Sequence, residues 1–308
     1  MEDWRLVAAT SLYYTTCIAV ASLTAFFYDY FLTFGDEVSR ILLWYSKLSV
    51  GKILFFLSKY TAFIDIPLNI LILFGNGLTP EACKYVGTAI TALSFVGVAT
   101  ADAILLVSLH ALLGSSKRGG IVLSALFALG FMTSLGFTVY FINTLQAVPP
   151  SYPGSICEYY HPPKQLDGLQ VCYYILLAGE FCITIAGLVL GLRDYRHAQS
   201  RLMINLYKDG TLYFVSLLMF STLNIVAPYI FPNGFGRILT PWQRAIHAIL
   251  ASRLVLNMRS NACNYVETFV ISTELRFGGK SESDASTSVE ERITLDTEIT
   301  RPLGAGLA

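Results

Sequence analysis

The chain has 308 residues, of which 54% are hydrophobic and 14% are charged, and its formal net charge is zero. A soluble domain carries about 25% charged residues, so this composition indicates a chain whose surface faces lipid. The zero net charge gives no indication of a nucleic-acid partner. Its six cysteines show no CxxC or CxxH spacing, which argues against a disulfide scaffold and against a zinc module.

A membrane-spanning helix needs about 20 largely apolar residues, and seven stretches meet this requirement. They cover residues 8–32, 53–74, 86–113, 119–145, 169–192, 211–232 and 239–257. The seventh is the weakest candidate, because it contains Arg244, His247 and Arg253. The sequence therefore predicts an all-α integral membrane protein in which residues 1–260 form a bundle of seven transmembrane helices. The lipid bilayer is its first partner, and no cofactor is expected.

The distribution of basic residues predicts the orientation, because Lys and Arg are enriched in cytoplasmic connections. Nine of them fall in the first, third and fifth connections, and four fall on the opposite side. This bias predicts an N-terminus outside and a C-terminus in the cytoplasm, in a membrane that we expect to be the plasma membrane. The sequence shows no internal repeat, which argues against the common secondary-transporter folds.

The connection between the first two spans is unusually apolar. If residues 36–48 are helical, one side carries Val38, Ile41, Leu42, Trp44, Tyr45 and Leu48, and most polar residues fall on the other side. The Trp and the basic residues suit a membrane surface, so we expect an interfacial helix over residues 36–48. The alternative is a short soluble helix packed on the bundle.

The stretch YDYFLTFGDEVSRILLWYSKLSVGKILFFLSKY, residues 28–60, resembles the signature of a fungal family of membrane proteins, domain-of-unknown-function family 6533. Members show a Tyr-Asp near the end of the first span, an acid before the loop helix, a Trp within it and a basic-Tyr pair in the second span. The signature covers residues 21–66, and residues 206–214 and 252–259 are similar to the same proteins. The resemblance implies a seven-helix fungal membrane protein, but no activity, because none is established for the family. The residues that carry it are Tyr28, Asp29, Glu37, Trp44, Lys59 (where Arg is more usual) and Tyr60.

Ionisable residues inside membrane spans are costly, and they mark either function or contacts between helices. Asp29 and Lys59 lie toward the inner ends of spans one and two, so we expect them to form an ion pair. The alternative for this pair is an ion or proton path. Asp65 lies two residues before Pro67, which should kink span two beside the carboxylate. The sequence leaves open whether the kink builds a polar pocket or only a water-satisfied distortion.

Asp102 in span three and Glu180 in span five lie among small residues, which let helices approach closely. We expect both carboxyl groups to face the interior of the bundle. They either line a cavity or remain as buried, protonated carboxyl groups that each hydrogen-bond a neighbour.

Two further groups of polar residues lie in the last two spans. Asp209 opens span six and Arg253 lies near the inner end of span seven, so we expect these two side chains to pair. The pair is either a static brace or a latch of the kind that opens when a receptor is activated. Arg244 and His247 lie in the outer third of span seven, where they either form an outward-facing pocket with Asp65 or let Arg244 reach the outer headgroups.

Three cysteines lie on the predicted outer side, which is an oxidising compartment. Cys83 begins span three, Cys157 lies in the long loop before span five, and Cys172 begins span five. A bridge between Cys83 and Cys157 would tie this loop to span three, as in many seven-helix receptors. A bridge between Cys157 and Cys172 is the competing possibility, because sequence does not fix connectivity.

The chain after span seven changes character. Residues 261–277 have apolar side chains at helical spacing and predict a short juxtamembrane helix, in which Cys263 is a candidate for palmitoylation. The alternative for Cys263 is an unmodified buried thiol. Residues 278–308 are polar, with Ser and Thr among acids, and predict a disordered cytoplasmic tail with phosphorylation sites.

These features favour a receptor-like protein that senses an outside ligand of unknown chemistry and signals through a cytoplasmic protein, by analogy of architecture. Span three has no acid-Arg-aromatic triplet and span seven has no Asn-Pro-x-x-Tyr, so the chain does not look like a rhodopsin-type receptor. The alternative is a transporter, channel or lipid-handling protein that uses Asp65, Asp102 and Glu180.

Two other classes of protein fit the sequence poorly. A retinal protein needs a Lys in span seven to form a Schiff base, and span seven has none. An enzyme is not expected either, because HExxH, GxSxG and clustered histidines are absent from the sequence.

Overall fold

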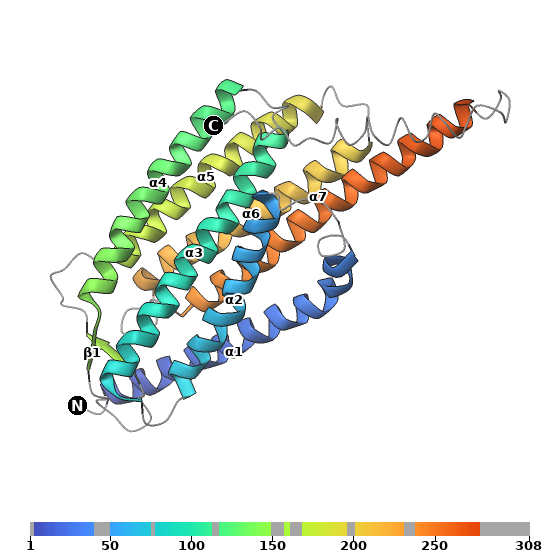
Figure 1. Cartoon of the computed structure of the whole chain (residues 1–308). Coiled ribbons are helices and arrows are strands. Elements are labelled where there is room, and N and C mark those ends of the chain that lie inside the picture. The colour runs from blue at the N-terminus through green and yellow to red at the C-terminus, as the bar shows by residue number, and fades with distance from the viewer. Residues whose placement is uncertain are drawn as a thin grey trace. The chain divides into compact units, whose positions relative to one another are not determined.

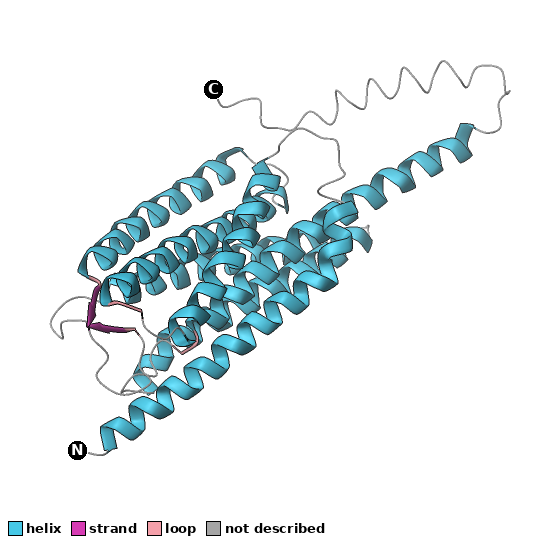
Figure 2. Ribbon diagram, turned by 60° about the horizontal axis from the view of Figure 1, so that its bottom comes forward, coloured by secondary structure: helices cyan, strands magenta, loops and turns pink. Residues whose placement is uncertain are grey.

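The computed structural model describes residues 3–39, 50–74, 78–112, 117–148, 157–160, 168–195, 201–230 and 238–277. In these residues the chain forms seven long helices and one two-stranded hairpin (Figures 1 and 2). The all-helical prediction is confirmed, with the small hairpin as the addition. The elements are α1 (Asp3–Glu37), α2 (Val50–Phe74), α3 (Pro80–Leu112), α4 (Lys117–Thr144), β1 (Gln146–Val148), β2 (Glu158–Tyr160), α5 (Gly168–Tyr195), α6 (Arg201–Ile230) and α7 (Thr240–Phe277).

Six of these helices, α1 to α6, are long and apolar enough to cross a membrane. Large apolar side chains are exposed on their outer faces, among them Phe31, Leu57, Val107, Leu129 and Val189. In water such faces would be unfavourable, but in a bilayer they meet lipid tails of the same polarity. The chain is therefore an integral membrane protein.

The start of α3 shows how the sequence sets a helix end. Pro80 is the first helical residue, where its missing N–H costs nothing and its fixed backbone angle suits the helix. Thr79 precedes it, and its Oγ1 accepts a hydrogen bond from the backbone N–H of Ala82 at 3.3 Å. Glu81 adds a negative charge in the first turn, where the helix dipole favours it.

The hairpin and a disulfide mark one end of the bundle. Strands β1 and β2 pair in antiparallel register between α4 and α5, with Ala147 opposite Tyr159. A disulfide joins Cys83, in the first turn of α3, to Cys157, which directly precedes β2. Consecutive helices from α1 to α6 pack against one another in order. Figures 1 and 2 show the hairpin at one end of the bundle.

The core of the bundle forms around the first half of α7. One hydrophobic cluster joins Ala251, Leu254, Val255 and Leu256 of α7 to side chains of α2, α3, α5 and α6. A second cluster joins Ala245 and Ala248 of α7 to Phe26 of α1 and to Ala62 and Ile66 of α2. The least apolar helix of the bundle thus packs against α1, α2, α3, α5 and α6.

The structure also bears on the expected segments outside the spans. The last predicted span and the juxtamembrane helix expected over residues 261–277 belong to one continuous helix, α7. Asp36 and Glu37, expected at the start of an interfacial helix, belong to the last turn of α1. Residues 40–48 of that expected helix and the tail, residues 278–308, lie outside the described residues.

Candidate functional site

A buried ion pair joins α2 to α7 in the interior of the bundle. Nε of Arg244 donates to Oδ2 of Asp65 at 2.7 Å, with both side chains at most 4% exposed. The same guanidinium donates from Nη2 to Oγ1 of Thr61 at 2.8 Å and to the carbonyl oxygen of Ser58 at 3.3 Å. Ser94 of α3 donates to Oδ2 of Asp65 at 2.9 Å. A charge inside a membrane needs this combination of an opposite charge and further hydrogen bonds.

Gly97 of α3 is what allows the guanidinium of Arg244 to lie between helices. A Cβ atom added at Gly97 would overlap Nη2 and Cζ of Arg244 and would crowd Oγ1 of Thr61. The absence of a side chain at this position therefore provides the space that the ion pair with Asp65 occupies.

A second group of ionisable residues brings together α3, α5 and α7. One ligand-type atom each from Asp102, Glu180 and His247 lies within 4.8 Å of the other two. Nε2 of His247 lies 2.9 Å from Oε1 of Glu180, and Nδ1 of His247 lies 2.9 Å from the carbonyl oxygen of Gln243. Both His247 and Glu180 are buried. Oδ1 of Asp102 and Oε2 of Glu180 are buried without a hydrogen-bond partner among the described residues.

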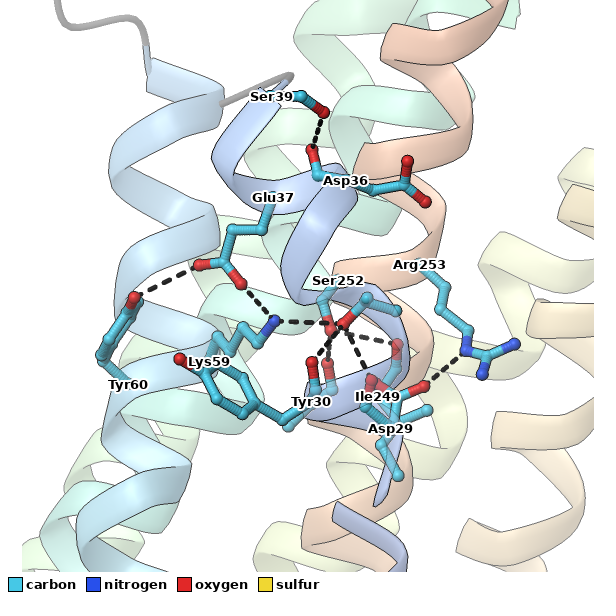
Figure 3. Close-up of polar contacts among 12 residues, drawn as sticks. Asp29, Tyr30, Asp36, Glu37, Ser39, Lys59, Tyr60, Ile249, Ser252 and Arg253 are labelled. Carbon is cyan, nitrogen blue, oxygen red and sulfur yellow. Dashed lines mark hydrogen bonds and ion pairs between the residues drawn. The ribbon is translucent and has the colours of Figure 1, made fainter. Parts of the chain in front are cut away.

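The third group joins α1 to α2 and is shown in Figure 3. Nζ of Lys59 lies 2.5 Å from Oε2 of Glu37 and 3.4 Å from Oγ1 of Thr33, and all three side chains are buried. Tyr60 donates from its hydroxyl to Oε1 of Glu37 at 3.2 Å. The ring of Tyr30 lies 4.9 Å from the Lys59 ammonium, close enough for a cation–π contact.

The fourth contact joins α1 to α7. Nε of Arg253 donates to Oδ1 of Asp29 at 2.6 Å (Figure 3). The carboxylate side chain is 6% exposed, whereas the Arg253 side chain is 43% exposed. This pair therefore differs from the buried Asp65–Arg244 pair, because one partner remains largely accessible from outside the bundle.

One of the pairings expected from the sequence is wrong, and a second involves a residue outside the described side chains. Lys59 does not pair with Asp29 but with Glu37. Asp29, Thr33 and Glu37 follow one another at intervals of four residues on one face of α1, so Asp29 lies about 12 Å along the axis from Glu37, beyond the reach of the same ammonium group. Arg253, which we expected to pair with Asp209, pairs with Asp29 in the described part of the chain, and its contact with Asp209 stays a prediction. The side chain of Asp209 lies outside the described residues.

The polar residues at the start of α7 also separate into two sites. Arg244 is 4% exposed and reaches Asp65, so the alternative in which it reaches the outer headgroups is wrong. His247 does not share the Asp65 site, because its ring nitrogens contact Glu180 and Gln243. Asp102 and Glu180 lie close to His247. Both carboxyl groups therefore face the interior of the bundle, as expected from the sequence.

The structure decides between the two disulfides that the sequence left open for Cys157. Cys83 pairs with Cys157, and Cys172 is not part of a disulfide; its sulfur lies 3.5 Å from Oγ1 of Thr138. The side chain of Cys263 lies outside the described residues, so its modification stays a prediction.

Sequence reasoning missed two relationships. Glu37 was expected only as a residue of the family resemblance, although it binds both Lys59 and Tyr60. The resemblance itself contained this signal, because it singled out all three residues. His247 was not linked to Glu180, and no spacing could have linked two residues on different helices, 67 positions apart.

Comparison with known proteins supports the resemblance noted in the sequence. Residues 17–64 match a family of unknown function, DUF6533. No curated protein matches the chain. The matched segment contains most of α1 and the first part of α2, and thus Asp29 and the whole Glu37–Lys59–Tyr60 group.

Proposed function

We propose that this chain, which belongs to the DUF6533 family of unknown function, is a receptor-like protein that senses an outside ligand and signals to a cytoplasmic protein. The proposal includes seven spans, an N-terminus outside, a cytoplasmic C-terminus and residence in the plasma membrane. It also includes a non-catalytic role, since the buried ionisable side chains pair with one another across helices.

The inclusion of α7 as a span is supported by its contacts and not by its hydropathy. Arg244, His247 and Arg253 make α7 too polar for a hydropathy criterion that the other six helices meet. Each of the three is paired with a carboxylate of another helix: Asp65 of α2, Glu180 of α5 or Asp29 of α1. Pairing with a carboxylate makes a basic residue compatible with a membrane span, and Arg244 and His247 are buried inside the bundle as well.

The observation that carries the receptor proposal is the Asp29–Arg253 ion pair. It connects α1, the helix that begins the family match, to α7, the helix that leads to the C-terminal segment. One partner is 43% exposed, so the pair is less enclosed than the Asp65–Arg244 pair and is better suited to act as a two-state contact. The disulfide that ties the hairpin to α3 supports a fixed, ligand-facing surface at the other end of the bundle.

Proximity labelling from the C-terminal tail tests this function. A labelling enzyme is fused after residue 308, and labelled proteins are compared with and without GTP analogues that hold G-proteins in one state. The proposal predicts nucleotide-dependent labelling of a G-protein α subunit. No such labelling of any signalling protein, with the fusion folded and at the cell surface, would contradict it.

A matched pair of variants makes the same experiment specific to the Asp29–Arg253 contact. Asp29→Asn removes the ion pair, whereas Asp36→Asn changes an exposed acid on the same helix. If the contact holds the resting state, Asp29→Asn changes the basal labelling of the signalling partner and Asp36→Asn does not. Equal labelling in the two variants argues for a static brace.

A second candidate function, ion transport, is favoured by one specific observation. Asp102 and Glu180 carry buried carboxylate oxygens without hydrogen-bond partners among the described residues, as a path for cations or protons requires. Cation and proton flux in proteoliposomes, measured for the wild type and for Glu180→Gln, distinguishes this function. Flux that is lost in the variant would favour a transporter over a receptor.

A further inference from the structure

The charges inside the bundle balance at three places and do not balance at a fourth. Lys59, Arg244 and Arg253 each pair with one carboxylate, those of Glu37, Asp65 and Asp29. Asp102 and Glu180, in contrast, both lie beside the single imidazole of His247. Two ionised carboxylates beside one neutral imidazole would carry an excess of negative charge, which is strongly unfavourable away from water unless a proton or a metal cation offsets it.

The imidazole of His247 is held in the orientation and tautomer that a metal ligand requires. A carbonyl oxygen can only accept a hydrogen bond, so Nδ1 of His247 carries the proton that it shares with Gln243 O at 2.9 Å. The lone pair of the neutral ring is then on Nε2, which faces Glu180 Oε1 at 2.9 Å. Histidines that bind metals almost always donate their other N–H to such a carbonyl or carboxylate.

The carboxylates supply oxygen atoms without another partner. Oδ1 of Asp102 and Oε2 of Glu180 are buried and have no hydrogen bond among the described residues. Leaving a buried polar atom without a partner is unfavourable, so an occupant that binds these oxygens is favoured. The ligand atoms come from three different helices and lie within 4.8 Å of one another, which leaves them around a common centre.

We propose that Asp102, Glu180 and His247 bind one divalent transition-metal ion, for which Zn²⁺ is the appropriate probe. One imidazole nitrogen and carboxylate oxygens are a ligand set that Zn²⁺ accepts at about 2.0–2.2 Å. Two carboxylates and a neutral imidazole carry a charge that a divalent cation cancels, which removes the imbalance described above. The site goes beyond the proposed function, because a receptor and a transporter are equally compatible with it.

The competing occupant is a proton. Glu180 Oε1 and His247 Nε2 can share one proton in a hydrogen bond, which would neutralise part of the charge without a metal. A proton leaves Zn²⁺ affinity at the level of adventitious surface sites, whereas a built site binds Zn²⁺ with defined stoichiometry. The two occupants are therefore distinguished by counting bound metal.

The first experiment counts Zn²⁺ in the full-length protein. The protein is purified in nanodiscs through a tag without histidine, stripped with a chelator, equilibrated with buffered Zn²⁺ and measured by elemental mass spectrometry. The variants are Asp102→Asn, Glu180→Gln and His247→Gln.

Matched controls on α3 are His110→Gln and the exposed Glu81→Gln. We expect wild type and controls to bind one Zn²⁺ more per chain than each site variant, or to bind it at least about tenfold more tightly. Equal binding by wild type and any folded site variant would overturn the proposal.

A second measurement decides the matter if the site variants do not fold. The sequence has four histidines, so replacing His110, His161 and His197 by Gln leaves His247 as the only imidazole. Zinc X-ray absorption of this triple variant is expected to show one imidazole nitrogen among oxygen ligands, and Zn²⁺ is expected to raise its melting temperature reversibly. A spectrum without an imidazole signal, or a melting temperature that Zn²⁺ does not raise, would overturn the site.

Discussion

Asp65 and Arg244 lie 179 residues apart in the sequence, and their side chains form an ion pair of 2.7 Å in the interior of the bundle. This contact joins α2 to α7 through a guanidinium group that also binds Thr61 and the backbone of Ser58. Together with the contacts of His247 with Glu180 and of Arg253 with Asp29, it explains how a helix with three basic residues within its first 14 positions can lie at the centre of an apolar bundle.

Removal of one partner of this pair should be costly. Asp65→Asn leaves the guanidinium of Arg244 buried without a counter-charge, and breaking a buried pair in this way costs about 3–5 kcal/mol. We expect a large fall in melting temperature in detergent, measured by intrinsic fluorescence. The exposed Glu81→Gln should change little, and Asp65→Asn with Arg244→Gln should recover part of the loss. A melting temperature of Asp65→Asn equal to that of Glu81→Gln would refute the buried pair.

Gly97 provides an independent test of the same site. Gly97→Ala places a methyl group where Arg244 lies, and the flexible guanidinium can yield only by giving up its contacts with Asp65 and Thr61. We expect a destabilisation of about 1–3 kcal/mol. The matched control is Gly136→Ala on α4, where a Cβ meets nothing within 4 Å and Ala should be neutral or stabilising. The same stability change in both variants would show that Arg244 is not confined at Gly97.

The Asp29–Arg253 pair should contribute much less to stability. The Arg253 side chain is 43% exposed, and ion pairs open to solvent contribute about 0.2–1 kcal/mol. A double-mutant cycle with Asp29→Asn and Arg253→Gln, followed by thermal unfolding, should give a coupling energy in this range. A coupling energy as large as that of the Asp65–Arg244 pair would mean that the contact is a permanent brace, and the latch would have to be abandoned.

The disulfide should stabilise the end of the bundle that carries the hairpin. Cys83 and Cys157 are 74 residues apart, and removing a cross-link across such a segment costs about 2–4 kcal/mol. We expect Cys83→Ser with Cys157→Ser to lower the melting temperature, and Cys17→Ser, a free exposed cysteine on α1, to leave it unchanged. Non-reducing peptide mapping should find Cys83 linked to Cys157, and Cys172 in no disulfide-linked peptide. A peptide that links Cys157 to Cys172 would contradict the structure.

The helices were predictable because membrane spans can be recognised in a sequence by their length and apolar composition. Their ends were less so, since α3 begins at Pro80, six residues before the predicted span, where capping by Thr79 matters more than hydropathy. The continuity of α7 beyond residue 257 was also missed, because the composition changes there although the helix does not end.

The residues of the site were predictable, but most of their partners were not. An ionisable residue within an apolar stretch is easily recognised in the sequence. This criterion found Asp29, Lys59, Asp65, Asp102 and Glu180. Helical spacing places Asp29 and Glu37 on one face of α1, and it cannot tell which of them lies at the level of Lys59. That choice depends on how far α2 is shifted along α1, which is set by packing of whole helices.

The proposed seven-span arrangement rests on α7, which the sequence offers only as the weakest of its seven candidate spans because of its basic residues. The most direct test uses small epitope tags at the two ends of the chain, probed with an impermeant antibody in intact and in permeabilised cells. With seven spans the N-terminal tag is reached in intact cells and the C-terminal tag only after permeabilisation. Both tags on the same side of the membrane would mean an even number of spans, and would contradict both the topology and the receptor proposal built on it.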